Sequence, residues 1–255
     1  MYETIRVENR GESIARIVLA RPPLNVLNIA MLKELCDAVD AIVARPRLRV
    51  VAIAAEGRAF SAGVDVEDHV GDKVAPMIAA FHGLFRRLAD LETVTVAEVH
   101  GHALGGGCEL AAFCDLVLAS EEATFGQPEI QLGLFPPVTA AAFRYFVHGK
   151  KTLELMLTGE RVDAREAQRI GLVNQTWPAE DFAAEAASFI ERLASRSGVA
   201  LRLSKKAYYA AVDAPFHEAL DRAERIYLRE LMQTEDALEG IAAFREKREP
   251  RWNDV

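Results

Sequence analysis

The sequence predicts an α/β fold over about its first 200 residues and a purely helical segment after them. Short apolar runs alternate with longer segments whose apolar residues recur at helical spacing, which is typical of right-handed βαβ units. The run at residues 50–55 is apolar throughout, as expected for a parallel strand that is covered on both faces. Beyond residue 200 only the helical pattern remains, so we expect a core at 1–200 and a helical subdomain at 201–255.

The first elements follow from local signals. Two β-branched runs, at 5–7 and 14–19, flank the turn residues 9–11, which predicts a β-hairpin. Asn28 is a suitable N-cap for a helix that extends to about Ala44. The next elements are a strand at 50–55, a helix at 74–91 and a strand at 94–99.

The later elements are predicted in the same way. A glycine-rich run precedes a helix that contains Glu109, and a strand follows at 116–119. Asp163 caps a short helix that ends at Gly171, and Pro178 stops a strand at 172–177. Further helices are expected from about residues 181, 199, 216 and 235.

Composition excludes several classes of function. The chain has 255 residues and a net charge of −8, which argues against nonspecific nucleic-acid binding because that needs a basic face. Its three cysteines lack metal-type spacing, and His100 and His102 lack an obvious third ligand, so we expect no metal. The first residues lack the apolar core of a signal peptide, and no apolar run approaches a membrane span. We therefore expect a cytoplasmic protein without nucleic-acid or membrane partners.

The glycine-rich run at 101–107 carries the chemistry. Three consecutive glycines, at 105–107, indicate positive φ or a close approach of another group to the backbone. The N–H groups at the start of the following helix have no intrahelical partner and lie at the positive end of the helix dipole. They can stabilise an oxygen that becomes negative during a reaction. Glu109 falls in the first helical turn, so the run predicts an oxyanion donor beside a carboxylate.

This run resembles the signature of the crotonase superfamily, the enoyl-CoA hydratases and isomerases. Two further blocks agree, at 59–65 (AFSAGVD) and 125–133 (FGQPEIQLG). The resemblance implies a crotonase-type spiral of ββα units with a C-terminal helical subdomain, and an acyl-CoA substrate with no separate cofactor. It also implies a homotrimer or homohexamer in which exposed apolar residues of the C-terminal helices contact other subunits, although the pattern alone equally allows packing within the chain. These apolar residues include Ile226, Leu231, Ile241 and Phe244.

By position in these motifs, the resemblance makes Glu109 and Glu129 the catalytic residues and the backbone N–H groups of Val64 and Gly106 the oxyanion hole. Hydration of a 2-enoyl thioester places negative charge on the thioester oxygen, which two N–H donors stabilise. It also needs an activated water and a proton for carbon, which two carboxylates in different protonation states provide. Each glutamate taken singly also has a noncatalytic explanation: Glu109 can stabilise the helix dipole, and Glu129 can be a solvated loop residue.

The resemblance also implies residues that contact the substrate and its CoA group. They are Leu24, Asn25, Ala62, Asp65, Val66, Glu67, Phe135 and Pro136. Lys247, in the basic run near the end of the chain, is a candidate cation for the CoA phosphates, either in this chain or from a neighbouring subunit. A solvated basic segment explains the same run equally well.

One segment departs from the pattern. Many hydratases have a glycine-rich loop where this chain has Leu134–Phe135–Pro136–Pro137. We call this segment the acyl wall, since the resemblance places it beside the acyl group, and its prolines make it stiffer than a glycine-rich loop. This segment and the block at 60–66 resemble the cyclohexa-1,5-dienecarbonyl-CoA hydratases. We therefore predict a hydro-lyase that adds water to an α,β-unsaturated acyl-CoA with a cyclic dienoyl group. The alternatives are a Δ3,Δ2-enoyl-CoA isomerase, which needs only one base, and a noncatalytic CoA-ester-binding or RNA-binding relative. A lost glutamate or a basic face would mark the noncatalytic relative.

Overall fold

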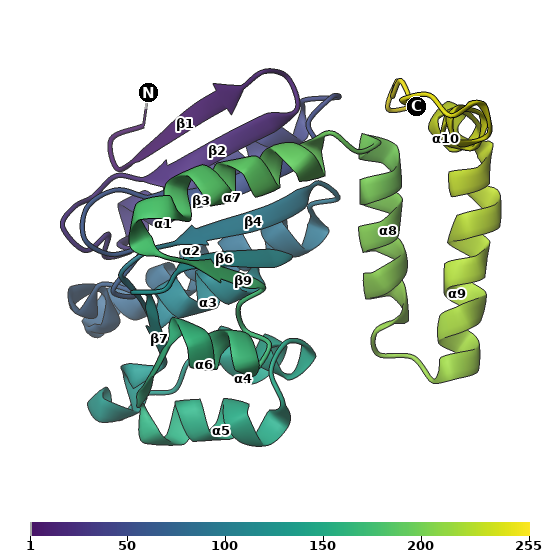
Figure 1. Cartoon of the computed structure of the whole chain (residues 1–255). Coiled ribbons are helices and arrows are strands. Elements are labelled where there is room, and N and C mark those ends of the chain that lie inside the picture. Colours follow the sequence, from purple (N-terminus) through teal and green to yellow (C-terminus); the bar gives the residue numbers. More distant parts are fainter. Residues whose placement is uncertain (1) are drawn as a thin grey trace.

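A six-stranded sheet forms the centre of the protein (Figure 1). The computed structural model describes residues 2–255. The strand order is β1-β2-β3-β4-β6-β9; β1 and β2 form the predicted antiparallel hairpin and the other neighbours are parallel. The strands are β1 (Ile5–Arg10), β2 (Ile14–Leu19), β3 (Val50–Ala55), β4 (Val94–Val99), β6 (Leu116–Ser120) and β9 (Gln175–Trp177). The predicted α/β class is therefore confirmed.

A second, smaller sheet positions the glycine-rich turn. It has the order β5-β7-β8, with β5 (His102–Leu104), β7 (Thr124–Gly126) and β8 (Arg161–Asp163). β4 of the large sheet is followed directly by β5, and β6 is followed directly by β7. These two passes of the chain each contribute one strand to each sheet before they enter a helix, as expected for the ββα spiral.

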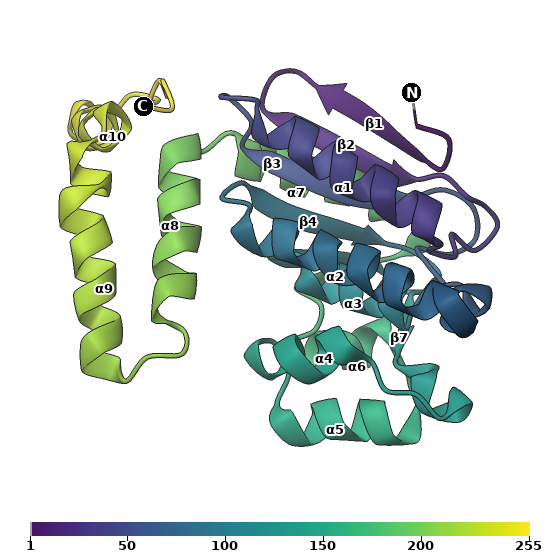
Figure 2. The ribbon, with the colours of Figure 1, turned by 180° about the vertical axis from the view of Figure 1, so that it is seen from behind.

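Helices cover both faces of the large sheet (Figures 1 and 2). α1 (Ile29–Val43), α2 (Val74–Asp90) and α3 (Gly106–Phe113) lie on one face, and α7 (Ala179–Ala194) lies on the other. Side-chain alternation in β3 explains both contacts, because Val51 and Ile53 join the core beneath α1 and α2 whereas Val50 and Ala52 pack with α7. The continuous apolar run at 50–55 reflects this burial on both faces.

Shorter elements surround the small sheet. The α-helices are α4 (Pro137–Ala142), α5 (Gly149–Thr158) and α6 (Ala164–Arg169). The 3₁₀ helices of the chain are η1 (Val66–His69), η2 (Gly71–Lys73), η3 (Pro128–Leu132), η4 (Phe143–Tyr145) and η5 (Leu231–Gln233). Both predicted caps are present: Asn28 accepts from the N–H of Met31 at 3.0 Å and Asp163 from that of Glu166 at 2.7 Å. None of the helices within residues 2–255 is long and apolar enough to cross a membrane.

The strand predicted at 172–177 is shorter than expected, since β9 begins only at Gln175. Gly171 has a φ of 86°, and the N–H groups of Leu172 and Val173 donate to the carbonyl oxygen of Ala167 at the end of α6. Both side chains are buried in the core. Their amides therefore complete the helix end, and pairing with β6 starts later.

The last helices form an arm that stands beside the sheet (Figures 1 and 2). We use "arm" for α8 (Gly198–Ala211), α9 (Phe216–Arg229) and α10 (Glu235–Glu246). Ile226 was expected to be exposed, but it is only 8% exposed because α8 and α9 pack against each other around it. Ile241 and Phe244 are exposed as expected. The division of the chain near residue 200 stays a prediction.

Candidate active site

The glycine turn between β5 and α3 brings a carboxylate against the backbone. Gly105 has a φ of 51°, its N–H donates to the carbonyl oxygen of Gly126 at 2.9 Å, and its own carbonyl oxygen accepts from the N–H of Glu109 at 2.9 Å. A Cβ placed on Gly105 would lie 2.5 Å from Oε1 of Glu129. Glycine is therefore required here both for the positive φ and for the approach of the carboxylate.

Two backbone N–H groups at this turn lack acceptors. Leu27 bridges Val64 in parallel fashion: its N–H donates to the carbonyl oxygen of Gly63 and its carbonyl oxygen accepts from the N–H of Asp65, so the N–H of Val64 is left over. Gly106 is the first residue of α3, where no intrahelical acceptor exists. Within residues 2–255 neither N–H has a hydrogen-bond acceptor.

The same two residues are in contact. A Cβ placed on Gly106 would lie 2.6 Å from Cγ2 of Val64 and 3.0 Å from the ring of Phe81. A Cβ placed on Gly63, the neighbour of Val64, would lie 3.8 Å from the nitrogen of Gly106. The structure therefore brings the two predicted oxyanion donors together, from the loop after β3 and the start of α3.

Glu109 is a buried carboxyl with a displaced pKa. It lies in the first turn of α3, is 2% exposed, and its Oε1 accepts from the N–H of Thr139 at 2.6 Å. Burial raises the pKa of Glu109 to about 7; the N–H of Thr139 opposes this change and the charge of Glu129 adds to it. Both protonation states of Glu109 are therefore populated near neutral pH, as general acid–base catalysis requires.

Glu129 lies on the other side of the glycine turn, in η3. Burial also raises the pKa of Glu129, against the stabilising effects of its own backbone N–H and of the charge of His69. Its Oε2 is buried, as are Oγ1 of Thr139 and the side-chain amide of Gln127, and none of these groups has a hydrogen-bond partner in the described part of the chain. Buried polar groups are normally paired, so these atoms are available to a substrate or to water.

The sequence matches the enoyl-CoA hydratase/isomerase family over residues 9–255. The chain belongs to this family. It is 38% identical to the probable enoyl-CoA hydratase echA8 of Mycobacterium tuberculosis over 98% of each protein. It is 37% identical to the cyclohexa-1,5-dienecarbonyl-CoA hydratase of Thauera aromatica over 96% of this chain and 95% of that one. The two identities are nearly equal, so they do not distinguish between the two substrate classes.

The fold of this family member agrees with solved structures. An enoyl-CoA hydratase subunit I from Geobacillus kaustophilus HTA426 superposes with a TM-score of 0.92 at 36% identity, covering 100% of this chain and 99% of that one. The crotonase-type fold expected from the motifs is thus confirmed, including the C-terminal helices α8–α10.

The early loop of this family member packs against the block that contains Val64. The N–H of Ala62 donates to the carbonyl oxygen of Leu24 at 2.9 Å. Asn25 is fully buried; its Oδ1 accepts from the N–H of Arg21, and its Nδ2 donates to the carbonyl oxygens of Glu56 and Ala59. The side chain of Asn25 is thus fully occupied within the chain, and it holds the early loop in place.

The remaining candidates near the block at 59–65 are Asp65, Val66 and Glu67, which lie at the start of η1. The side chain of Asp65 caps η1 by accepting from the N–H of Glu67 at 3.1 Å, and one of its oxygens lies 3.5 Å from Nη1 of Arg21. Val66 and Glu67 are exposed on the following turn. A cation and an apolar side chain therefore border the block that contains Val64, a predicted oxyanion donor.

The predicted acyl wall adjoins Glu109, but Lys247 does not. Pro136 is buried at the start of α4, the helix whose Thr139 binds Glu109, and Phe135 before it is 66% exposed. Lys247 is exposed at the C-terminal end of α10, which lies far from α3 in both views (Figures 1 and 2). Within one chain, Lys247 therefore cannot serve this site.

Sequence reasoning missed Thr139 and the specific role of Gly105. Thr139 is 30 positions from Glu109, and no local pattern connects a threonine in a short helix to a carboxylate in another. Gly105 belonged to the recognised glycine run, but only the fold shows that Glu129 lies against it.

Proposed function

We propose that the chain adds water to an α,β-unsaturated acyl-CoA, with Glu109 and Glu129 as the catalytic pair and the N–H groups of Val64 and Gly106 as the oxyanion hole. The observation that carries this proposal is the meeting, at one turn, of two unpaired N–H donors and two carboxyls of raised pKa. Family membership supplies the thioester substrate.

The reaction follows from the protonation of the pair. Burial and the charge of Glu129 raise the pKa of Glu109 to about 7, so Glu109 can hold a proton near neutral pH. The ionised member takes a proton from water as the water oxygen bonds to the β-carbon, and the protonated member gives its proton to the α-carbon. The negative charge passes through the thioester oxygen, where the N–H groups of Val64 and Gly106 stabilise it. The net change is the addition of one water across the double bond.

We also propose that the acyl group is a cyclic dienoyl group. Two consecutive prolines, Pro136 and Pro137, stand at the start of α4, where they fix φ and prevent the predicted acyl wall from adjusting to different acyl chains. Val64 narrows the space beside Gly106, since its Cγ2 would lie 2.6 Å from a Cβ placed there, next to the ring of Phe81. A rigid ring loses little conformational freedom in such a site, and its conjugated diene spreads the developing charge.

The pair of carboxyls also bears on the alternatives. An isomerase needs one base, and a noncatalytic relative needs none, whereas this chain keeps two carboxyls of raised pKa at the turn. Hydration is therefore the reaction that uses both carboxyls.

A panel of linear and cyclic acyl-CoA esters, with products identified by mass, tests the proposal. Hydration adds the mass of one water, whereas isomerisation leaves the mass unchanged. We expect kcat/KM for a cyclic dienoyl-CoA at least about tenfold above that for crotonyl-CoA, equal to roughly 1.4 kcal/mol. If crotonyl-CoA is the better substrate, the cyclic assignment is wrong and a short-chain hydratase remains. Products of unchanged mass would replace hydratase by isomerase.

Finally, we propose that the arm packs against other copies of the chain in a homotrimer or a homohexamer. A groove of about 630 Å³ runs between α8 and α9, and its lining includes the exposed apolar residues Leu220, Tyr227 and Leu228. Light scattering combined with size-exclusion chromatography measures the assembly directly, and a monomeric mass would refute this proposal.

A further inference from the structure

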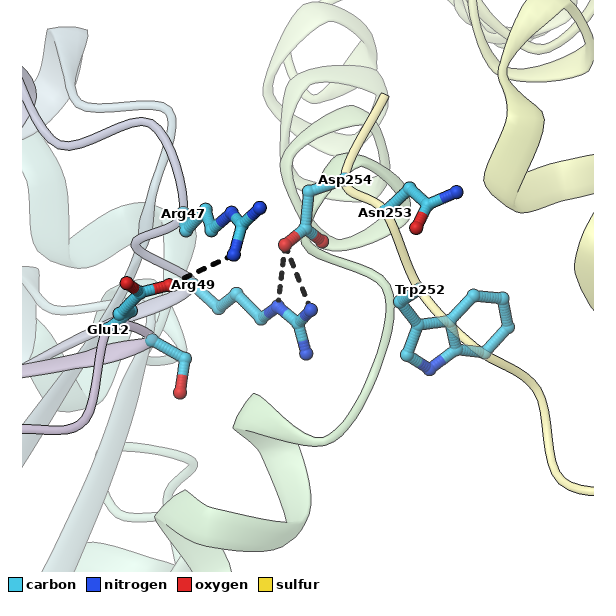
Figure 3. A pocket seen from close by; sticks show the side chains of 7 residues that line it. Glu12, Arg47, Arg49, Trp252, Asn253 and Asp254 are labelled. Carbon is cyan, nitrogen blue, oxygen red and sulfur yellow. Dashed lines mark hydrogen bonds and ion pairs between the residues drawn. The ribbon is translucent and has the colours of Figure 1, made fainter.

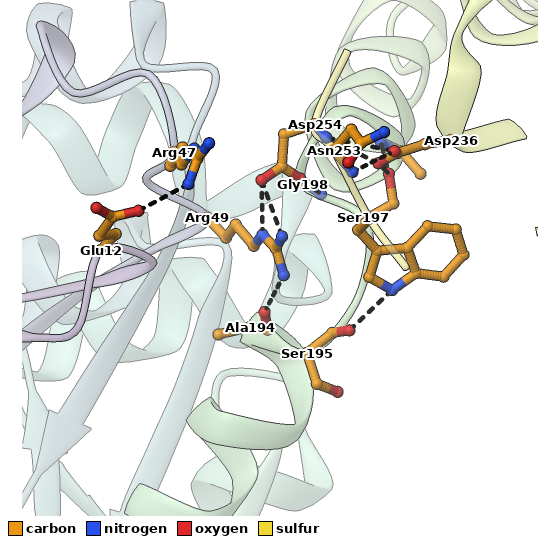
Figure 4. Close-up of polar contacts among 12 residues, drawn as sticks. Glu12, Arg47, Arg49, Ala194, Ser195, Ser197, Gly198, Asp236, Asn253 and Asp254 are labelled. Atoms are coloured by element: carbon orange, nitrogen blue, oxygen red, sulfur yellow. Dashed lines mark hydrogen bonds and ion pairs between the residues drawn. The ribbon is translucent and has the colours of Figure 1, made fainter. Parts of the chain in front are cut away.

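Segments far apart in the sequence meet where α7 joins α8, beside a cavity of about 410 Å³ (Figure 3). Arg49, just before β3, donates from Nε and Nη2 to Oδ2 of Asp254 at 3.1 and 2.9 Å. The two side chains are only 16% and 5% exposed. Arg49 also donates from Nη1 to the carbonyl oxygen of Ala194 at the end of α7 (Figure 4). We use "body" for residues 2–194 and "tail" for residues 247–255. One guanidinium therefore joins the start of β3, the end of α7 and the tail.

The tail also caps the arm. Oδ1 of Asp254 accepts from the N–H of Gly198, the first residue of α8, at 2.7 Å (Figure 4). A carboxylate is favoured there by the free N–H groups and by the helix dipole. A Cβ on Gly198 would lie 2.8 Å from Oδ1 of Asp254 and 3.0 Å from Cγ of Arg49, so only glycine permits this contact.

A second carboxylate, from α10, completes the cluster. Oδ2 of Asp236 accepts from the hydroxyl of Ser197 at 2.5 Å, and its Oδ1 accepts from the N–H of Asn253 at 2.8 Å. The hydroxyl of Ser197 in turn accepts from the N–H of Ala200 and so caps α8. The indole N–H of Trp252 donates to the carbonyl oxygen of Ser195 at 3.0 Å. The start of α8, the start of α10 and the tail are thus held at one place.

We propose that Arg49, Ser197, Asp236 and Asp254 form a lock that closes the arm onto the body and fixes the direction in which the arm leaves it. A second copy of the chain then meets the arm in one orientation; this last step rests on the proposed assembly. The lock is a conformational device that none of the catalytic groups requires.

A second attachment explains why the lock controls direction. In the middle of α8, Lys205 lies 2.8 Å from a carboxylate oxygen of Asp115, and the hydroxyl of Tyr209 donates to the other oxygen at 3.0 Å. Two attachments along α8 define its axis, whereas one alone allows it to pivot. Opening the lock therefore frees the start of α8, together with α10 and the tail, while the middle of α8 stays attached.

Hydrogen exchange measured by mass spectrometry tests the lock, with Arg49→Met as the first variant. Arg47→Met is the matched control, because Arg47 lines the same cavity but is 71% exposed and, within residues 2–255, pairs only with Glu12 (Figure 3). We expect Arg49→Met to speed exchange at least about tenfold in the first turn of α8 and in α10, since a buried carboxylate loses its partner. Exchange in β3 and β4 is expected to stay unchanged, and Arg47→Met to match the native protein.

A second variant distinguishes local opening of the lock from general misfolding. Arg49→Met combined with Asp254→Asn removes both charges of the buried Arg49–Asp254 pair and is expected to give the same local pattern. Unchanged exchange in the arm, or an equal increase throughout the sheet, would overturn the lock.

The assembly step has its own measurement, the subunit dissociation constant from mass photometry. We expect the lock variants to dissociate at least about tenfold more readily than the native protein and the Arg47→Met control. Faster exchange with an unchanged dissociation constant would overturn the link to orientation. If the native protein is a monomer, the assembly proposal fails, and the exchange comparison still decides whether the lock exists.

Discussion

Replacing Glu109 by glutamine changes how stability depends on pH. Glu109 is 2% exposed, and burial raises its pKa from the ordinary value of 4.5 to about 7. As pH rises from about 4.5 to 7, the carboxyl ionises in the unfolded chain while it stays protonated in the folded protein. Ionisation of the carboxyl stabilises only the unfolded state in this pH range. The free energy of unfolding therefore falls between about pH 4.5 and pH 7 and levels off above pH 7.

The size of the effect follows from the two pKa values. The interval from 4.5 to about 7, at about 1.4 kcal/mol for each pH unit, gives about 3 kcal/mol. Glutamine cannot ionise, and its amide oxygen can still accept from the N–H of Thr139. Glu129 titrates in both proteins, so its contribution cancels except for its coupling to Glu109. We therefore expect Glu109→Gln to gain about 3 kcal/mol relative to the native protein between about pH 4 and pH 8.

Urea unfolding followed by circular dichroism, at a fixed protein concentration and at closely spaced pH values, measures this difference. Any pH-independent cost of the amide is removed by using about pH 4, where the side chain is neutral in both proteins, as the reference. A difference that stays flat from pH 4 to pH 8, or one that falls, would refute the assignment of a raised pKa to Glu109. The same variant also tests catalysis, since kcat is expected to drop at least about 10²-fold.

Two further predictions concern the other groups at the turn. Glu129→Gln is expected to lower kcat at least about 10²-fold with CoA-ester binding retained, as steady-state kinetics and calorimetry can show; full activity would remove Glu129 from the mechanism. Gly106→Ala is expected to cost on the order of 10²–10³-fold in kcat because its Cβ would lie 2.6 Å from Cγ2 of Val64. Gly149→Ala, where a Cβ meets nothing within 4 Å, is the control, and Val64→Ala added to Gly106→Ala is expected to restore part of the loss. An active Gly106→Ala variant whose dichroism spectrum is native would contradict the oxyanion assignment.

Much of the large sheet could be predicted from the sequence because its strands and helices are long enough to show a period. The caps Asn28 and Asp163 were found because capping depends on residues three positions apart. The strands β5, β7 and β8 were not predicted, since three residues are too few to show alternation. Ile226 was misplaced because a helical stripe shows which side of a helix is apolar but not which neighbour covers it.

The candidate site was predicted only as far as its motifs reach. Glu109, Glu129, Val64 and Gly106 stand in recognisable blocks, and the structure places them around one turn. The contact of Thr139 with Glu109 depends on how α4 docks on α3, which is decided by packing of segments that are remote in sequence. The raised pKa values likewise depend on burial, which no motif specifies.

The spiral has a consequence for how specificity can change without loss of the chemistry. Val64, Gly106 and Glu129 come from three successive passes of the chain, after β3, β4 and β6, so the reactive geometry is tied to the regular pitch of the sheets. The segment 134–137 follows Glu129 in the last of these passes and leads into α4, and the N–H of Leu134 donates to the carbonyl oxygen of Glu129 at 3.0 Å. Because this contact is made by the backbone, side-chain substitutions in the segment can reshape the predicted acyl wall while the strands hold the predicted catalytic groups in place. A scaffold of this kind assigns the shape of the acyl pocket and the predicted chemistry to different residues of the site.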